Sequence, residues 1–249
     1  MAVTIKSPRE IELMREAGRI LAKTHEELAK NLRPGMSTWD IDHMGEEIIR
    51  SYGCIPSFKN YNGYPASICV SVNDEVVHGI PHKEHFLDEG DIVSLDAGVI
   101  YKGYHSDAAR TYGIGEIDDD AKKLIEVTRQ SFFEGIKFAK AGNHLNDISS
   151  AIQAYAESFG YGVVRDLVGH GIGTHLHEEP EVPNFAQKRK GIKLVPGMTL
   201  AVEPMINIGT PNVVWMDDDW TVVTKDHSLS AHYENTILIT EGEPEILSL

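Results

Sequence analysis

Two aspartates in one predicted hairpin are the first residues in this sequence whose types and spacing suggest chemistry. Asp96 lies in IVSLDAGV, a segment apolar enough to be a buried strand, where an unpaired carboxylate costs several kcal/mol. A tight turn at Lys102-Gly103 would place Asp96 opposite residue 109. Asp107 would then lie two positions along on the same face of the hairpin. Two carboxylates that close either share a proton or bind a cation, so the hairpin predicts a cation site.

An internal repeat adds two more acidic residues. The segment GMSTWDI from Gly35 matches GNHLNDI from Gly142, an offset of 107 residues. The same offset aligns Asp96 with Glu203, and Glu234 begins another apolar strand, HYENTILIT. Four carboxylates, two from each half, are expected to converge where the halves meet. One imidazole from the stretch LVGHGIGTHLHEEP would complete five ligands for two divalent ions, and mostly carboxylate ligation suits Mn, Fe(II) or Co.

Helices and strands that could position these acids are readable from the sequence. Ser7-Pro8-Arg9-Glu10 is a capping box, and apolar residues follow it at helical spacing until Pro34-Gly35. The hairpin turn at residues 102–103 separates two apolar strands. The predicted elements are helices at about 8–32, 38–52, 118–140 and 144–159, strands at about 66–73 and 91–114, and a strand-rich C-terminal third.

The repeat predicts the fold class. We expect an α/β (α+β) fold of two pseudo-symmetric halves, each combining helices with an antiparallel sheet, around a central pair of metal ions. The halves span about residues 5–115 and 116–245. No Pro/Ser-rich linker separates them, so residues 1–249 are expected to form a single domain.

Charge and composition argue against several other classes. The 249 residues include 38 acidic and 23 basic side chains, a formal net charge of -15, which disfavours binding to nucleic acid or anionic membranes. The N-terminal sequence MAVTIKSPREIELMREAG has no apolar signal segment, and no later run is long enough to cross a bilayer. We therefore expect a cytoplasmic protein. Two cysteines are too few for a disulfide framework or a Cys-based zinc site.

Other motifs contribute little. There is no H-E-x-x-H, G-x-S-x-G or Walker sequence, so hydride and phosphate chemistry have no support. Glu178 and Glu179 are expected to lie in a solvated turn before Pro180, and we assign them no role in the site.

Five segments together resemble a known family. NDEVVHGIP, SLDAGV followed by SDAART, GHGIGTHLHEEP, AVEP and YENT occur in the order found in type I methionine aminopeptidases. The resemblance runs from about residue 5 to 245 and is to bacterial-type members. It implies the pita-bread fold, whose two pseudo-symmetric halves agree with the repeat. It also implies an enzyme that removes the initiator methionine from newly made polypeptides.

The resemblance implies a role for each matching residue in the reaction. The implied metal ligands are Asp96, Asp107, His170, Glu203 and Glu234, of which Asp107 and Glu234 bridge the two ions. The implied catalytic residues are His78 and His177, which contact the scissile peptide, and Glu203, which passes a proton to the leaving amine. The two ions would lower the pKa of a bridging water toward neutrality, and the hydroxide would attack the first peptide carbonyl.

The same resemblance implies a methionine pocket. Tyr61, Tyr64 and Cys69 match positions that line it, and Trp220 matches one on its rim. Two positions depart from the family pattern. Leu176 stands where many members have phenylalanine, and Asn235 follows Glu234 where histidine is usual, so preferences for the second substrate residue are not carried over.

Two alternative functions remain open at this point. A proline-directed dinuclear peptidase, of the aminopeptidase P or prolidase type, resembles this ligand set, but those relatives usually carry an additional N-terminal domain, whereas this chain begins almost at its first helix. A non-enzymatic binding module of the same fold would be expected to have lost ligands. The expected partners are the N-terminal methionine of nascent polypeptides and, transiently, the ribosome, and the protein is expected to be a monomer.

Overall fold

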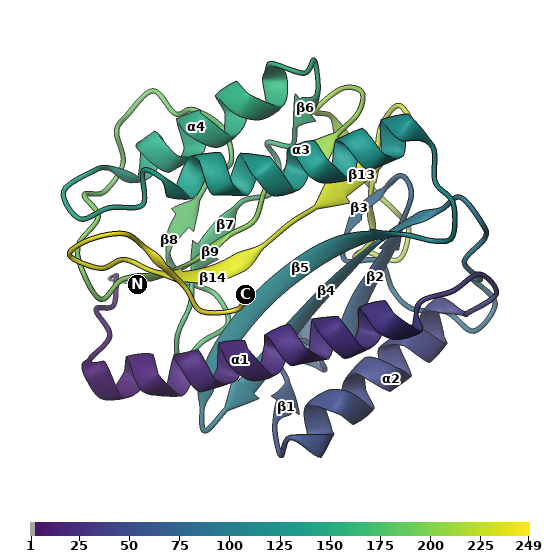
Figure 1. Cartoon of the computed structure of the whole chain (residues 1–249), viewed down its shortest axis with the longest axis horizontal. Helices are drawn as coiled ribbons and strands as arrows, with labels where there is room; N and C mark the ends of the chain where they lie inside the picture. Colours follow the sequence, from purple (N-terminus) through teal and green to yellow (C-terminus); the bar gives the residue numbers. More distant parts are fainter. Residues whose placement is uncertain (1–2) are drawn as a thin grey trace.

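Within residues 3–249, four helices form two pairs that flank the strands (Figure 1). The computed structural model describes residues 3–249. The helices are α1 (Pro8–Asn31), α2 (Thr38–Ser51), α3 (Asp119–Ile136) and α4 (Leu145–Glu157), with one 3-10 turn, η1 (Tyr61–Gly63). The α1–α2 pair lies along one side of the strands and the α3–α4 pair along the other, so each half of the chain supplies one pair.

Every strand pairing in the described part of the chain is antiparallel, and the strands form two larger and two smaller sheets. One larger sheet has the order β1 (Ile55–Pro56), β4 (Ile92–Tyr101), β2 (Ile68–Val72), with β5 (Tyr104–Gly113) also paired to β4. The other has the order β15 (Glu245–Ile246), β14 (Asn235–Leu238), β9 (Thr199–Val202), β7 (Gly169–Gly171), β8 (Glu178–Val182). One smaller sheet has the order β13 (Ser230–His232), β10 (Met205–Asn207), β6 (Gly162–Val163). The other has the order β11 (Val213–Trp215), β12 (Val222–Thr224), β3 (Glu75–Val77).

The predicted helices and strands are confirmed with small changes at their ends. The Ser7 side chain accepts from the backbone N–H of Glu10, and the Glu10 carboxylate accepts from the Ser7 N–H, so the capping box begins α1. The β4–β5 hairpin turns at residues 102–103. Helix α3 ends at Ile136, earlier than predicted, because Phe138 N–H turns back to the carbonyl of Gly135 at 3.0 Å and closes a tight turn.

The 107-residue repeat is visible in matching backbone contacts. Gly35 N–H donates to the Leu87 carbonyl at 2.7 Å, and Gly142 N–H donates to the Leu194 carbonyl at 2.9 Å. Both glycines have positive φ, 82° and 95°, a conformation that favours glycine because it has no Cβ. These contacts fix the entry to α2 and to α4 in the same way, which agrees with the predicted pseudo-symmetric halves.

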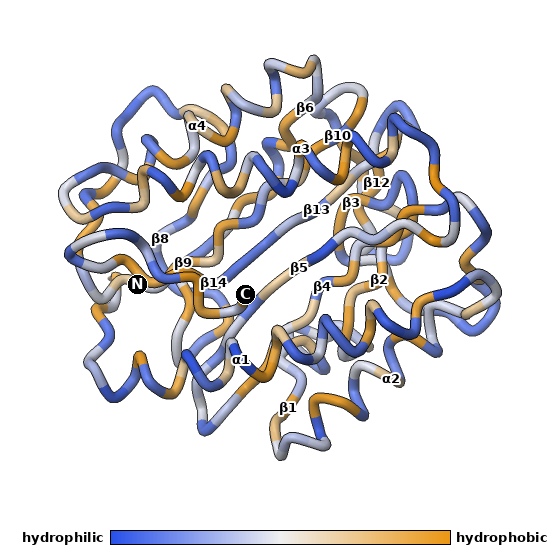
Figure 2. Tube along the Cα trace, in the orientation of Figure 1, coloured by the Kyte–Doolittle hydropathy of each residue, from blue (hydrophilic) through white to orange (hydrophobic). Residues whose placement is uncertain are grey.

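Each helix pair buries an apolar face against its sheet. One cluster joins α1 and α2 to β2 and β4 and includes Leu21, Leu28, Ile41 and Leu95. A second joins α3 and α4 to β9 and β14 and includes Phe132, Ile148 and Leu200. Figure 2 shows apolar and polar residues alternating along the helices, as amphipathic packing requires. Within residues 3–249, none of the helices combines the length and apolar composition needed to cross a bilayer.

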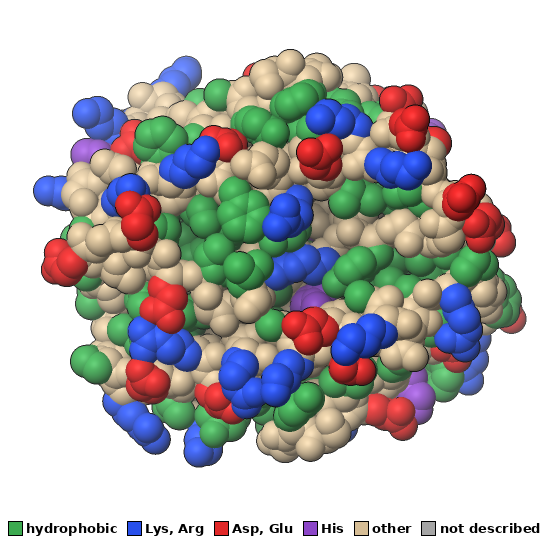
Figure 3. Space-filling view, in the orientation of Figure 1, with side chains coloured by type: hydrophobic (Ala, Val, Ile, Leu, Met, Phe, Trp, Pro, Cys, Tyr) green, Lys and Arg blue, Asp and Glu red, His purple; other side chains and the backbone are tan. Residues whose placement is uncertain are grey.

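Acidic and basic side chains are interspersed on the face of the molecule that Figure 3 displays, with no continuous basic surface on that face. Over the whole sequence the acidic side chains are in excess, and the formal net charge is -15.

Candidate metal centre and active site

The β4–β5 hairpin brings Asp96 and Asp107 together. Asp96 pairs with Ala109, as predicted, and Asp107 pairs with Gly98. Because side chains alternate across a strand, the two carboxylates project from the same face of the hairpin, two positions apart. Both aspartates line one cavity of about 330 Å³.

Strands of the second half add Glu203 and Glu234. Asn235 pairs with Val202 across β14 and β9, so the two glutamates at the ends of these strands face each other. The backbone N–H of Glu234 donates to the Ala109 carbonyl at 3.0 Å, which ties this point to the hairpin that carries the aspartates. The junction between the halves therefore collects four carboxylates.

His170 enters the same cluster from β7. Its Nε2 lies 3.8 Å from Asp107 Oδ2 and 3.6 Å from Glu203 Oε1. Its Nδ1 lies 2.9 Å from the Gly171 carbonyl, which leaves Nε2 free to bind a cation. Asp107, His170 and Glu234 each offer one ligand atom, all within 4.8 Å of one another.

The cluster lacks the compensation that buried charge requires. Among the described residues, Asp96 Oδ1, Asp107 Oδ1 and Glu234 Oε1 are buried with no hydrogen-bond partner. Burial, together with repulsion between the acids, raises the pKa of Asp107 and of Glu234 well above its usual range. A divalent cation would compensate both the lost hydration and the repulsion, so this oxygen-rich donor set fits such ions.

Two further histidines face this cavity. His78 adopts a left-handed conformation with φ 59°, rare for a residue with a side chain and frequent at functional sites. His177 Nδ1 lies 2.8 Å from the Tyr61 hydroxyl, and its ring stands edge-on to His170 with centroids 4.2 Å apart. Burial lowers the pKa of His78 to about 4 and lowers that of His177, so both imidazoles are neutral near pH 7.

An apolar recess opens beside the carboxylates. Cys69 is 4% exposed and Leu176 is 2% exposed, and both line the cavity. The Tyr64 ring packs edge-on against Trp220 with centroids 5.1 Å apart, and the Tyr64 hydroxyl donates to the Gly79 carbonyl at 2.9 Å. The recess can therefore hold an apolar side chain next to the acidic cluster.

The structure gathers the whole predicted set of site residues into this one cavity. Its lining includes Asp96, Asp107, His170, Glu203, Glu234, His78, His177, Tyr61, Tyr64, Cys69 and Trp220. Of the two departures, Leu176 lies in the lining, whereas Asn235 is turned toward Arg110, whose Nη2 donates to the Asn235 Oδ1 at 2.6 Å.

Two features differ from the sequence interpretation or were missed by it. The expectation of a solvated turn at Glu178 is wrong: Glu178 lies in β8, its side chain is 7% exposed, and its Oε2 pairs with Lys6 Nζ at 2.6 Å. His232 was not identified, although it faces Glu203 and Glu234. The sequence feature that could have identified His232 is its position two residues before Glu234, because alternate residues of an extended segment share a face.

This fold and this carboxylate-rich centre define a metallopeptidase, and comparison with known proteins agrees. Residues 12–241 match the description "Metallopeptidase family M24". The methionine aminopeptidase of Clostridium acetobutylicum is 57% identical over 99% of both chains, and methionine aminopeptidase 1 of Bacillus subtilis is 52% identical over 99% of both. The chain belongs to metallopeptidase family M24 and, within it, to the methionine aminopeptidases.

Solved structures show the same relationship. The crystal structure of methionine aminopeptidase from Thermotoga maritima has a TM-score of 0.97 and 48% identity over 99% of both chains. An Xaa-Pro dipeptidase from Bacillus anthracis has a TM-score of 0.79 and 28% identity, and the similarity covers 98% of this chain but 61% of that one. The pita-bread fold is thus shared with proline-directed enzymes, while the full-length similarity is to methionine aminopeptidases.

Proposed function

We propose that this chain removes the initiator methionine from the N-terminus of newly made polypeptides by metal-dependent hydrolysis of the first peptide bond. The observation that carries the proposal is the single cavity in which four carboxylates and His170 stand beside two neutral histidines and an apolar recess. Its volume of about 330 Å³ falls in the range of small-ligand sites.

We propose that five residues bind two divalent ions, which could be Co, Mn, Fe(II) or similar. These residues are Asp96, Asp107, His170, Glu203 and Glu234. Ions bound there would act as Lewis acids and would bring the pKa of a water molecule toward neutrality. Asp107 and Glu234 would each help to hold both ions.

The two neutral histidines would orient the scissile peptide. Since His177 Nδ1 faces the Tyr61 hydroxyl, a phenol that donates there leaves the His177 Nε2–H to donate to the substrate carbonyl, where negative charge develops. His78 would contact the scissile amide from the other part of the lining. Glu203, in the same lining, is assigned the transfer of a proton to the leaving amine.

The recess beside the acids would hold the methionine side chain. Tyr61, Tyr64 and Cys69 supply its walls and Trp220 its rim, and burial keeps the Cys69 thiol neutral because it raises the pKa of that group. A flexible thioether suits such an irregular apolar and aromatic surface.

Cleavage of three peptides by the protein loaded with Co(II) or Mn(II) tests this function. Met-Ala-Ser should release methionine, whereas an Xaa-Pro-Xaa peptide and Nα-acetylated Met-Ala-Ser should remain intact. Preferential cleavage before proline would instead assign the proline-directed activity. A well-folded protein that binds metal and cleaves none of the peptides would support a binding module.

The proposed setting is the cytoplasm, where the enzyme would act as a monomer and meet nascent chains during transient contact with the ribosome. Light scattering in solution should give a mass near the 27.6 kDa of one chain. Cosedimentation with ribosomes should weaken as salt is raised.

A further inference from the structure

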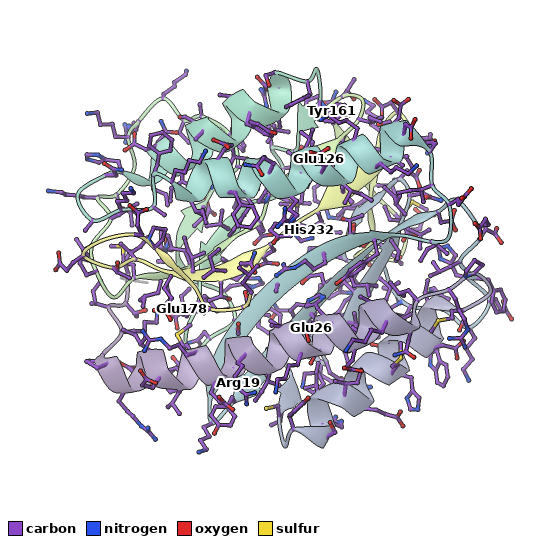
Figure 4. All side chains as sticks on the ribbon, in the orientation of Figure 1. Arg19, Glu26, Glu126, Tyr161, Glu178 and His232 are labelled. Atoms are coloured by element: carbon purple, nitrogen blue, oxygen red, sulfur yellow. The ribbon has the colours of Figure 1, made fainter. Side chains whose placement is uncertain are left out.

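His232 is a buried imidazole for which neither the fold nor the proposed reaction has yet given a role. It ends β13, where it pairs with Met205 of β10. Its side chain is 1% exposed, and neither Nδ1 nor Nε2 has a hydrogen-bond partner among the described residues. Burying an imidazole with both nitrogens unpaired is costly, so a missing partner is expected. Figure 4 labels His232 near the middle of the molecule, between the two helix pairs.

The distances around His232 identify that partner. His232 Nε2 lies 3.9 Å from Glu203 Oε2 and 4.0 Å from Glu234 Oε2. Both separations are too long for hydrogen bonds. They are close to twice a metal–ligand bond of about 2.0–2.2 Å, the largest separation that two ligands of one ion can have.

His170 provides an internal comparison. Its Nε2 stands at 3.6 Å and 3.8 Å from two carboxylate oxygens, nearly the same spacing. Glu203 turns Oε1 toward His170 and Oε2 toward His232, so one carboxylate lies between two imidazoles. Glu203, His232 and Glu234 each offer one ligand atom, all within 4.8 Å of one another.

We propose that His232 is a sixth protein ligand of the metal centre, binding an ion through Nε2 together with Glu203 and Glu234. His232 lies outside the lining of the substrate cavity and instead lines a second cavity with Arg110 and Tyr233. It therefore reaches the two glutamates from outside the substrate cavity, where it adds a nitrogen ligand without occupying substrate space. The inference rests on the proposed metal centre.

Titration with CoCl2 under anaerobic conditions tests the assignment without any activity measurement. The variants are His232→Gln and His232→Ala, with His170→Gln as the reference at a proposed ligand of the five-residue set. His25→Gln is the matched control, because His25 is also fully buried but its Nε2 contacts the Ala108 carbonyl instead of an acid. Circular dichroism of each variant establishes that it is folded.

Proton NMR of the Co(II)-loaded proteins counts the metal-bound imidazoles through their paramagnetically shifted, exchangeable N–H signals. We expect two such signals in the wild type and in His25→Gln, and one in each of the His232 and His170 variants. Loss of a ligand should also weaken Co(II) binding at least about tenfold. X-ray absorption of the wild type, which should count two imidazoles among the Co(II) ligands, decides the matter if the His232 variants fail to fold.

Two results would overturn the assignment while leaving the metal centre intact: one imidazole signal in the Co(II)-loaded wild type, or two signals in a folded His232→Gln protein. Weakened binding with an unchanged signal count would make His232 a positioning residue and also refute ligation. Failure of the wild type to bind Co(II) would refute the metal centre itself.

Discussion

Asp96 and Asp107 lie on the same face of one hairpin, paired with Ala109 and Gly98, and each has a buried oxygen with no hydrogen-bond partner among residues 3–249. Antiparallel register fixes their spacing more tightly than two residues on separate loops could. Without a cation, burial disfavours the negatively charged form of both carboxyl groups.

Replacing Asp107 with asparagine should therefore uncouple metal binding from folding. Asp107→Asn should weaken binding of Mn(II) or Co(II) by at least about tenfold and abolish most of the activity, because the amide is a poorer ligand. Removing a buried, uncompensated charge should meanwhile leave the metal-free protein as stable as the wild type or more so. Calorimetric metal titration and thermal unfolding in chelator check both parts.

The control for this prediction is Asp88→Asn, a change at an exposed position. An Asp107→Asn protein that binds two ions at wild-type affinity would refute the bridging role of Asp107.

His78→Ala should separate chemistry from metal binding. His78 lines the cavity but is not placed among the ligands, so kcat should fall by about 10²- to 10⁴-fold with the metal content unchanged. Metal analysis alongside peptide cleavage gives both numbers. Loss of bound metal from this variant would contradict the assignment, and His82→Ala, an exposed change, should behave as the wild type.

Leu176→Ala should damage methionine recognition as well as stability. Truncating a leucine that is 2% exposed should cost about 2–5 kcal/mol of unfolding free energy. The enlarged recess should raise KM for Met-Ala-Ser more than it lowers kcat. Leu200→Ala, at a fully buried position outside the cavity lining, should cost similar stability with KM unchanged, and equal KM values for the two variants would exclude Leu176 from the pocket.

Glu46 should make part of the stability depend on acid pH. A hydrogen bond from Lys59, reinforced by Arg50 and Ser67, lowers the pKa of Glu46 to about 2. The unfolded value is about 4.3, so the contribution is fully present above that pH and is lost as pH falls through about 2. Glu46→Gln should cost about 1–3 kcal/mol at pH 7 and progressively less below pH 4. Urea unfolding at pH 7, 4 and 2.5 measures this, and a difference that does not depend on pH would contradict it.

The buried pair of Lys6 and Glu178 ties the N-terminal segment to β8. The two side chains are 5% and 7% exposed, so Glu178→Gln would leave a buried ammonium with the neutral Thr4 hydroxyl but without its ionic partner and should cost about 3–5 kcal/mol. The exposed pair of Lys30 and Glu27 is the control, since Glu27→Gln should cost less than about 1 kcal/mol. Urea unfolding at pH 7 compares them, and equal costs would show that burial does not strengthen the first pair.

The sequence alone determined the features that depend on local spacing. The capping box at Ser7, the turn at residues 102–103 and the 107-residue repeat each depend on residues close in the chain or on a constant offset, and each is present in the structure. The facing of Asp96 and Asp107 follows from the turn alone, because strand alternation leaves no other arrangement.

Tertiary structure alone decided which partners these side chains meet. The sequence around Glu178 predicts a solvated turn, yet the Glu178 side chain is buried and forms an ion pair with Lys6, which is far away in the chain. His232 is one histidine among 12, and its place two residues before Glu234 accounts for one neighbour, but Glu203 joins it through the pairing of β13 with β10. The reason is that burial and electrostatic contact arise from strands that are distant in sequence, whereas propensity and periodicity report only on a residue's own segment.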